Sequence, residues 1–229
     1  YYKYISKDFP QNVPVYLPTG TSSYTTNSGE INKEGIDVQF NARPLAMKNL
    51  SWDISATWAY LLSNKVVDID GDPTTNKGRQ VVETIWNGNG APYLVHLDGQ
   101  QWGTIFGNGK KRDAAGNPLL DGSGNYITDN AVNYGNALPR YTGGVQNSFT
   151  VFGNFTINAN IDYQLGGKFF SLSDFWGTFS GLTARTAELN DRGIPVRDPV
   201  ADGGGVHVFG VDATGKDVDY YVDAQTYFH

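Results

Sequence analysis

The sequence predicts an all-β fold, namely a segment of a transmembrane antiparallel β-barrel with long extracellular loops. Four segments alternate apolar and polar residues, which is the pattern of a strand with one apolar face. These segments run about ten residues or more, and a tilted strand needs about 9–11 residues to cross a bilayer. Very short and very long connections alternate along the chain, which is typical of membrane barrels.

The cleanest alternation lies at 155–165, where Phe155, Ile157 and Ile161 are separated by Thr, Asn and Asp. The expected strands lie near 1–7, 32–45, 50–66, 139–152 and 155–168. The polar positions carry mostly small uncharged side chains, which suit the inner wall of a barrel better than a solvent-facing sandwich. The set that we expect to face lipid is Ile36, Val38, Phe40, Trp52, Ile54, Ala56, Trp58, Ile157, Ala159 and Ile161.

The connections indicate which rim of the barrel is which. We expect tight turns at 44–49 and 152–154, and long loops at 67–138 and 169–229. Membrane barrels have short periplasmic turns and longer extracellular loops, so the tight turns mark the periplasmic side. Two apolar runs within 93–106 could form one more hairpin, and the pattern leaves this open. Aromatic residues near both strand ends predict two aromatic girdles.

Composition excludes several classes of protein. The 229 residues include no cysteine, so neither a disulfide framework nor a thiolate metal site is possible. Net charge is −6, which argues against a nucleic-acid partner. Charged residues are 17%, below the roughly 25% of an ordinary soluble domain. The chain has no visible leader, and we interpret it as an internal piece of a longer protein.

Several phrases in order carry a family resemblance. Residues 29–43 lead into a strand through an Asn-Lys-Glu-Gly-Ile-Asp run, and residues 50–66 follow as its partner strand. Residues 98–107 (DGQQWGTIFG) are similar to a family phrase E-G-x-P-x-G-x-x-Y-G, with Gln101 at the usual proline. Residues 135–144 (GNALPRYTGG) match G-x-x-x-P-K/R-Y/F-x-G-G, the most specific of the phrases. Together they resemble the SusC/RagA family of TonB-linked outer-membrane receptors.

The resemblance implies a place and a function for the chain. It implies part of a 22-stranded barrel in the bacterial outer membrane, with an N-terminal plug and final strands that are not in this chain. It further implies TonB-dependent import of an oligomeric nutrient, a glycan or a peptide, under a SusD-like surface lipoprotein lid. The TonB complex would act through the absent plug segment, and outer-membrane lipid would surround the barrel. No enzyme site and no cofactor are expected.

Aromatic side chains in the long loops are the expected contacts with ligand or lid, because flat rings in polar surroundings suit sugar rings and peptide side chains. A packing role within the loops is the alternative. These candidates are Trp86, Tyr93, Trp102, Tyr134, Phe175 and Trp176.

Two other groups of residues bear on metal binding. Asp68, Asp70 and Asp72 form a weak calcium candidate, although Pro73 breaks the EF-hand pattern. The three histidines are far apart, so no metal site is expected.

A soluble β-sandwich binding module or adhesin is the alternative fold and function. Dependence on detergent would separate the membrane barrel from the soluble sandwich.

Overall fold

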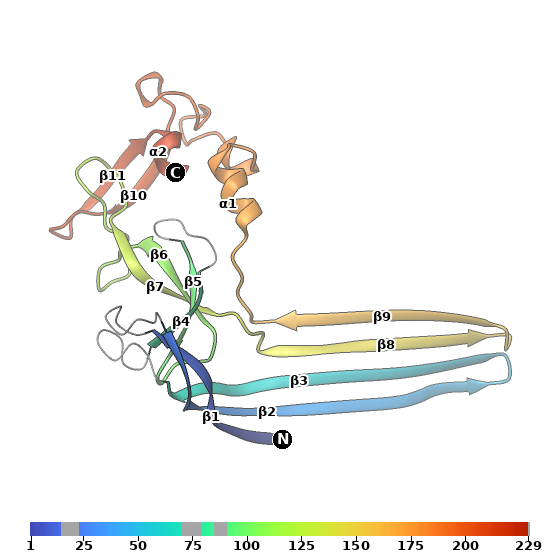
Figure 1. Ribbon diagram of the computed structural model, residues 1–229. Coiled ribbons are helices and arrows are strands. Elements are labelled where there is room, and N and C mark those ends of the chain that lie inside the picture. The colour runs from blue at the N-terminus through green and yellow to red at the C-terminus, as the bar shows by residue number, and fades with distance from the viewer. Residues whose placement is uncertain (15–22, 70–78, 85–90, 229) are drawn as a thin grey trace. The chain divides into compact units, whose positions relative to one another are not determined.

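Long antiparallel strands dominate the computed structural model, which describes residues 1–14, 23–69, 79–84 and 91–228 (Figure 1). The chain divides into two units. Unit 1 comprises Tyr1–Phe106 and Asn133–Phe169, and unit 2 comprises Gly107–Val132 and Phe170–His229. The predicted antiparallel all-β fold is confirmed.

Unit 1 is built on one sheet of five antiparallel strands in the order β1-β2-β3-β8-β9. Every neighbouring pair in this sheet is antiparallel, and the five strands form an open sheet in Figure 1. The strands are β1 (Tyr2–Pro14), β2 (Ser23–Met47), β3 (Leu50–Asp68), β8 (Tyr141–Val151) and β9 (Phe155–Leu165).

A β-bulge near the tight end of β2 explains how a proline is accommodated within this strand. The register shifts between Ala42 and Leu45, so Arg43 and Pro44 lie opposite Asp53 alone. Proline has no backbone N–H to donate to the ladder, and bulges tolerate it for that reason. The Arg43 guanidinium Nε donates to the Asp53 carboxylate over 2.6 Å and closes the bulge on the polar side.

The observed strands differ in extent from the expected ones. β2 begins at Ser23 rather than near residue 32, and its turn shrinks from the expected 44–49 to Lys48-Asn49. The proline at 44 suggested an earlier end to the strand, but the bulge absorbs it. The turn at 152–154 lies where it was expected.

The segment expected as the first long loop contains regular structure. A four-stranded sheet has the order β4-β5-β6-β7. Its strands are β4 (Arg79–Thr84), β5 (Tyr93–Leu97), β6 (Thr104–Lys110) and β7 (Thr128–Asn136). The hairpin that the sequence left open at 93–106 is therefore present, and it belongs to this separate sheet rather than to the five long strands.

Unit 2 holds the segment expected as the second long loop, and it also folds. Its hairpin of β10 (Val206–Val211) and β11 (Asp217–Val222) is antiparallel. Leu120, Val208 and Val222 are buried together as its core. The other elements are α1 (Leu172–Phe179), η2 (Ala184–Thr186), η3 (Val200–Asp202) and α2 (Ala224–Phe228).

Tight Asp-x-x-Gly turns organise the connections of unit 2. In one of them Asp121 accepts backbone hydrogen bonds from Ser123 (2.8 Å) and Asn125 (2.9 Å). Gly124 in the same turn has φ +84°, a conformation that glycine adopts without steric cost. The hydrogen bond from the Asn125 backbone contributes most to holding the pKa of Asp121 below its usual value. Equivalent turns begin at Asp113 and Asp212.

None of the helices in the described residues is long and apolar enough to cross a membrane.

Candidate functional site

The five-stranded sheet has one apolar and one polar side, and strand register defines both. Antiparallel partners directly opposite one another share a side of the sheet. Phe40 pairs with Ala56, Ala56 with Val145, and Val145 with Ile161. The rows next to it pair in the same way, so all ten residues expected to face lipid lie on one side. The exposed fractions of Val38, Phe40, Ile157 and Ile161 range from 50% to 65%.

Aromatic rings cluster at two levels of this apolar side. Trp52 stacks on Phe149 at 5.5 Å near the tight turns, and Tyr60 stacks on Tyr141 at 4.7 Å further along. The eight residue-to-residue steps from Trp52 to Tyr60 span about 27 Å of strand. Membrane barrels carry an apolar band about 25 Å tall between two aromatic girdles. The spacing of the two clusters is comparable with that band.

A polar group also lies on this side. Asn147 is opposite Ile54 in the ladder, and its amide oxygen accepts from the Trp52 indole N–H over 3.2 Å. An amide on an apolar surface needs such a partner, because an unsatisfied polar group in hydrocarbon costs several kcal/mol (roughly 4–8 by transfer to alkane). Asn147 lies one residue past the midpoint of β8 (Tyr141–Val151).

The opposite side of the sheet forms a polar hollow of about 730 Å³. Its wall is mostly uncharged, and the Arg43–Asp53 ion pair supplies its charges. Small amides and hydroxyls line it, among them Asn41, Ser55, Gln146, Ser148, Asn158 and Asn160. Such side chains bind water and other polar groups without holding them by charge.

The two tight turns lie at the same end of the strands, as Figure 1 shows. The backbone N–H of Phe152, in the second turn, donates to the carbonyl of Asn49, in the first, over 2.8 Å. This direct bond places both turns side by side. β3 and β9 therefore finish at the opposite end of the sheet, where the two long segments begin.

Hydrogen bonds and ring stacking around Trp102 and His96, here called the clasp, tie the 98–107 segment to the end of β3. Trp102 donates its backbone N–H to the Asn64 carbonyl over 2.7 Å, and its indole stacks on His96 at 3.3 Å between ring centroids. His96 Nδ1 accepts from the Gly103 backbone N–H over 3.1 Å, and the imidazole is 3% exposed. Burial lowers the pKa of His96 to about 4, because desolvation disfavours the charged ring.

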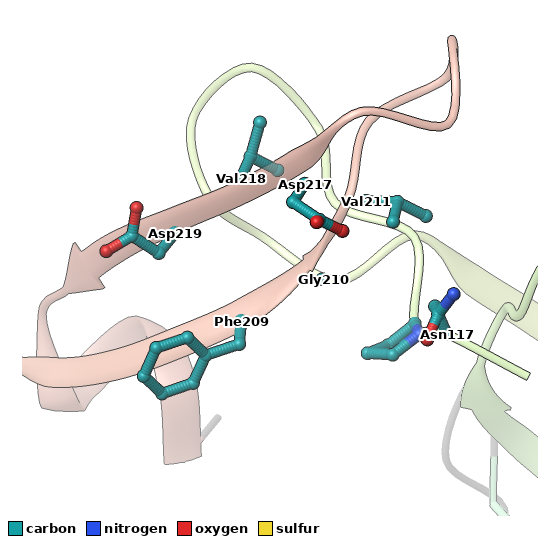
Figure 2. A pocket seen from close by; sticks show the side chains of 8 residues that line it. Asn117, Phe209, Gly210, Val211, Asp217, Val218 and Asp219 are labelled. Atoms are coloured by element: carbon teal, nitrogen blue, oxygen red, sulfur yellow. The ribbon is translucent and has the colours of Figure 1, made fainter.

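Unit 2 carries a surface pocket of about 410 Å³ on its hairpin (Figure 2). Phe209 on β10 lies opposite Asp219 on β11, and the next pair on the same side of the hairpin is Val211 with Asp217. The 117–118 loop closes the other end of the pocket. Gly210 permits this approach, because a Cβ there would lie 2.3 Å from the Pro118 carbonyl oxygen.

No family model matches the chain. A stretch of 129 residues is 25% identical to the TonB-dependent receptor SusC of Bacteroides thetaiotaomicron, covering 52% of this chain and 13% of that receptor. The fold matches a chain of the RagAB peptide transporter with a TM-score of 0.51 and 16% identity, covering 71% of this chain and 18% of that one. The resemblance to SusC/RagA-type TonB-dependent receptors is confirmed. The chain spans less than a fifth of the length of either relative.

The aromatic residues predicted for the long loops lie in separate places. Tyr93 stacks on Phe106 across β5 and β6 at 6.2 Å, and Trp102 belongs to the clasp on β3. Tyr134 lies on β7 and is 45% exposed. Phe175 and Trp176 are neighbours in α1, with ring centroids 5.4 Å apart. Trp86 lies outside the described residues.

The structure does not gather these rings into a single site. Trp102 has the packing role that the sequence left as the alternative, since it contacts His96 and Phe9. Trp176 is 42% exposed and contacts Phe175 and Phe179 edge-on. Direct contact with ligand or lid stays a prediction for each of them.

The calcium candidate is only partly covered by the described residues. Asp68 is the last residue of β3 and is exposed, whereas Asp70 and Asp72 lie outside the described ranges. Within those ranges, no group of three or more His, Asp or Glu side chains is arranged to hold a metal ion.

The pocket of unit 2 was missed by the sequence analysis. The alternation of Val206, Val208 and Val222 against His207, Phe209 and Asp219 marks a two-sided hairpin. This signal was present in the sequence but lay in a segment interpreted as loop. The contribution of residues 117–118 joins from about 90 positions away, and no local pattern indicates it.

Proposed function

We propose that the protein containing this segment imports an oligomeric nutrient, a glycan or a peptide, across the bacterial outer membrane. Import would be TonB-dependent and would proceed together with a SusD-like surface lipoprotein. One observation supports this above all others: the sheet pairs an exposed apolar side, with two aromatic levels, with a small-residue polar side. The likeness to SusC supports the energy source.

The two sides of the sheet would contact different surroundings in such a protein. Lipid hydrocarbon offers no hydrogen bonds, so only closed barrels and helices can span it. The apolar side of β2, β3, β8 and β9 would contact lipid, and further strands of the whole protein would pair with the free edges. The polar side would line the barrel interior against the plug.

Transport by this arrangement needs no bond chemistry from the segment. Ligand would bind at the extracellular side, and the lipoprotein lid would cover it there. TonB, driven by the inner-membrane proton gradient, would pull on the plug and open a path along the polar wall. The uncharged lining of that wall gives a polar ligand hydrogen-bonding partners without a strong charge to trap it.

A soluble sandwich or adhesin is not favoured. In a sandwich, a second sheet covers the apolar side and buries it in a core about 10 Å thick. Val38 and Phe40 on β2, and Ile157 and Ile161 on β9, are instead 50–65% exposed. An uncovered apolar area of this size in water would drive aggregation.

The proposed function is tested with the full-length receptor in its own bacterium. Deleting its gene is expected to remove the receptor from the outer-membrane fraction and to abolish growth on one oligomeric nutrient, with growth on the monomer unchanged. Depleting TonB should give the same loss, and the purified receptor should carry a lipoprotein with it. Recovery of the receptor in the soluble fraction would refute the proposal. Growth on every oligomer without any dependence on TonB would refute it as well.

A further inference from the structure

We propose that the hairpin pocket of unit 2 binds a cationic side chain, arginine or lysine, of a peptide ligand. This inference rests on the proposed function and narrows its substrate class to a basic peptide. The pocket, its aromatic ring and its two carboxylates carry the argument (Figure 2).

The β10–β11 hairpin separates a structural side from a chemical side. Val208 pairs with Tyr220, and both belong to the core of unit 2. His207, Phe209 and Asp219 alternate with these residues and point to the other side of the hairpin. Val208 is 2% exposed and Phe209 is 60% exposed, so the core does not need the Phe209 ring. A large exposed ring on a rigid hairpin is available for binding.

A row of stacked groups ends at this ring. The Arg192 guanidinium lies 3.4 Å from the centroid of the Tyr221 ring. Tyr221 stacks on His207 at 4.3 Å with an interplanar angle of 10°, and His207 contacts Phe209 at 4.0 Å. Phe209 is the last ring of this row and borders the pocket.

Negative charge surrounds the open end of the row. Asp217 and Asp219 both line the pocket, and no basic side chain of the described residues does so. Asp219 uses one carboxylate oxygen on His207 Nε2 at 2.9 Å, which leaves its second oxygen for another donor. Asp217, two residues before Asp219 on β11, is exposed. The pocket therefore presents hydrogen-bond acceptors and negative charge beside an aromatic face.

The other end of the row, at Tyr221, shows that an aromatic ring beside a carboxylate holds a guanidinium. There a guanidinium covers an aromatic ring whose hydroxyl donates to a carboxylate, as Arg192, Tyr221 and Asp191 do. Phe209 with Asp219 and Asp217 repeats the ring and the carboxylates, and no Arg or Lys of the described residues lines the pocket. A cation above the Phe209 ring would gain attraction from the ring quadrupole and from the carboxylates together.

A neutral sugar is the weaker match for this pocket. Sugar rings stack on aromatics too, but they gain nothing from two neighbouring anionic groups that must be desolvated on binding. A cation compensates that desolvation directly. An anionic ligand would be repelled by both carboxylates. The charge of the pocket thus favours arginine or lysine over glycans.

The test measures peptide binding to the full-length receptor purified in detergent. The probes are a short labelled peptide with one central arginine, the same peptide with citrulline, and a malto-oligosaccharide. Citrulline keeps the shape of arginine but has no charge. The arginine peptide should bind at least fivefold more tightly than the citrulline peptide, and high salt should reduce this difference.

Two variants and one control locate the binding. Asp217→Asn and Phe209→Leu should each weaken arginine-peptide binding about three- to tenfold and leave citrulline-peptide binding unchanged. The matched control is Asp202→Asn, an exposed aspartate of unit 2 that does not line the pocket. It should bind like the unaltered receptor.

Equal affinity for the two peptides, unchanged binding in both variants, or tight binding of the oligosaccharide alone would overturn the inference. Outer-membrane localisation and nutrient-dependent growth are scored in the same strains. If the receptor still imports a nutrient while the variants have no effect on peptide binding, only the pocket assignment fails. Loss of TonB-dependent import in the unaltered strain would overturn the proposed function itself.

Discussion

β9 in unit 1 and the β10–β11 hairpin in unit 2 both alternate apolar with polar residues, yet their apolar sides meet different surroundings. On β9, Ile157 and Ile161 are 61% and 65% exposed. On the hairpin, Val208 and Val222 are 2% and 8% exposed and pack on Leu120. The same period therefore accompanies an exposed apolar side in one unit and a small protein core in the other.

Periodicity therefore identifies the apolar side of a strand, but it does not show whether that side contacts lipid, water or protein. Length and the opposite side supply the missing information. β9 runs 11 residues with amides and hydroxyls on its polar side, which suits a membrane crossing. Each strand of the hairpin has six residues, and its outward side carries aspartate, histidine and aromatic rings.

The largest effect is expected in the core of unit 2. Leu120→Ala removes a side chain that is 2% exposed, and it should destabilise unit 2 by about 3–5 kcal/mol through lost burial and the cavity left behind. Limited proteolysis of the receptor against denaturant measures this change. The control is Leu182→Ala, which is 82% exposed and should shift stability by less than about 0.5 kcal/mol. Equal effects would mean that unit 2 has no core of this kind.

A charge on the apolar side of β9 should cost nearly as much. Ile161→Arg places arginine near the middle of the strand and should destabilise the folded barrel by about 2–4 kcal/mol. Asn160→Arg, one position away, points to the polar side and should cost far less. Urea titration of the receptor in lipid vesicles compares the two. A larger penalty at Asn160 would reverse the assignment of the two sides.

A smaller effect concerns the clasp that joins the 98–107 phrase to β3. Burial holds the folded pKa of His96 at about 4, below its ordinary value of 6.5. A lowered folded pKa means that the clasp is fully stable above pH 6.5 and loses stability as pH falls from 6.5 towards 4. The loss should be on the order of 1–2 kcal/mol near pH 5.

Hydrogen exchange measures this loss at one amide. The Gly103 N–H donates to His96 Nδ1, and protonation of that nitrogen removes the acceptor. After correction for the intrinsic rate, protection of Gly103 should fall between pH 6.5 and pH 5. In His96→Gln the protection should no longer change over this range. A constant protection factor in the unaltered protein would show that the ring does not titrate there.

The sheet was the part that the sequence predicted best. Alternation over Phe155–Leu165 and along β3 gave the two sides before any register was known, because one side of each strand meets a single environment. Pro44 was the misleading signal. It indicates a turn in isolation, but a bulge that pairs Arg43 with Asp53 keeps it inside β2.

The folded structure within the long segments could not be predicted in the same way. The Asp-x-x-Gly turns at 113, 121 and 212 were readable as turns, but which strands they join depends on partners far along the chain. Leu119 bridges to Val211, and the Gly99 N–H donates to the carbonyl of Val66. The stack of Trp102 on His96 and the pocket at Phe209 depend on such contacts, and local periodicity contains no trace of them.

The central claim is that this sheet crosses the outer membrane with its two short turns on the periplasmic side. Because the chain contains no cysteine, single cysteines report position without background from this segment. Asn154→Cys marks a short turn, and Thr214→Cys marks the loop between β10 and β11. A membrane-impermeant maleimide added to intact cells should label Thr214→Cys and spare Asn154→Cys until the outer membrane is opened. Labelling of Asn154→Cys in intact cells, with Thr214→Cys protected, would contradict the topology and the account built on it.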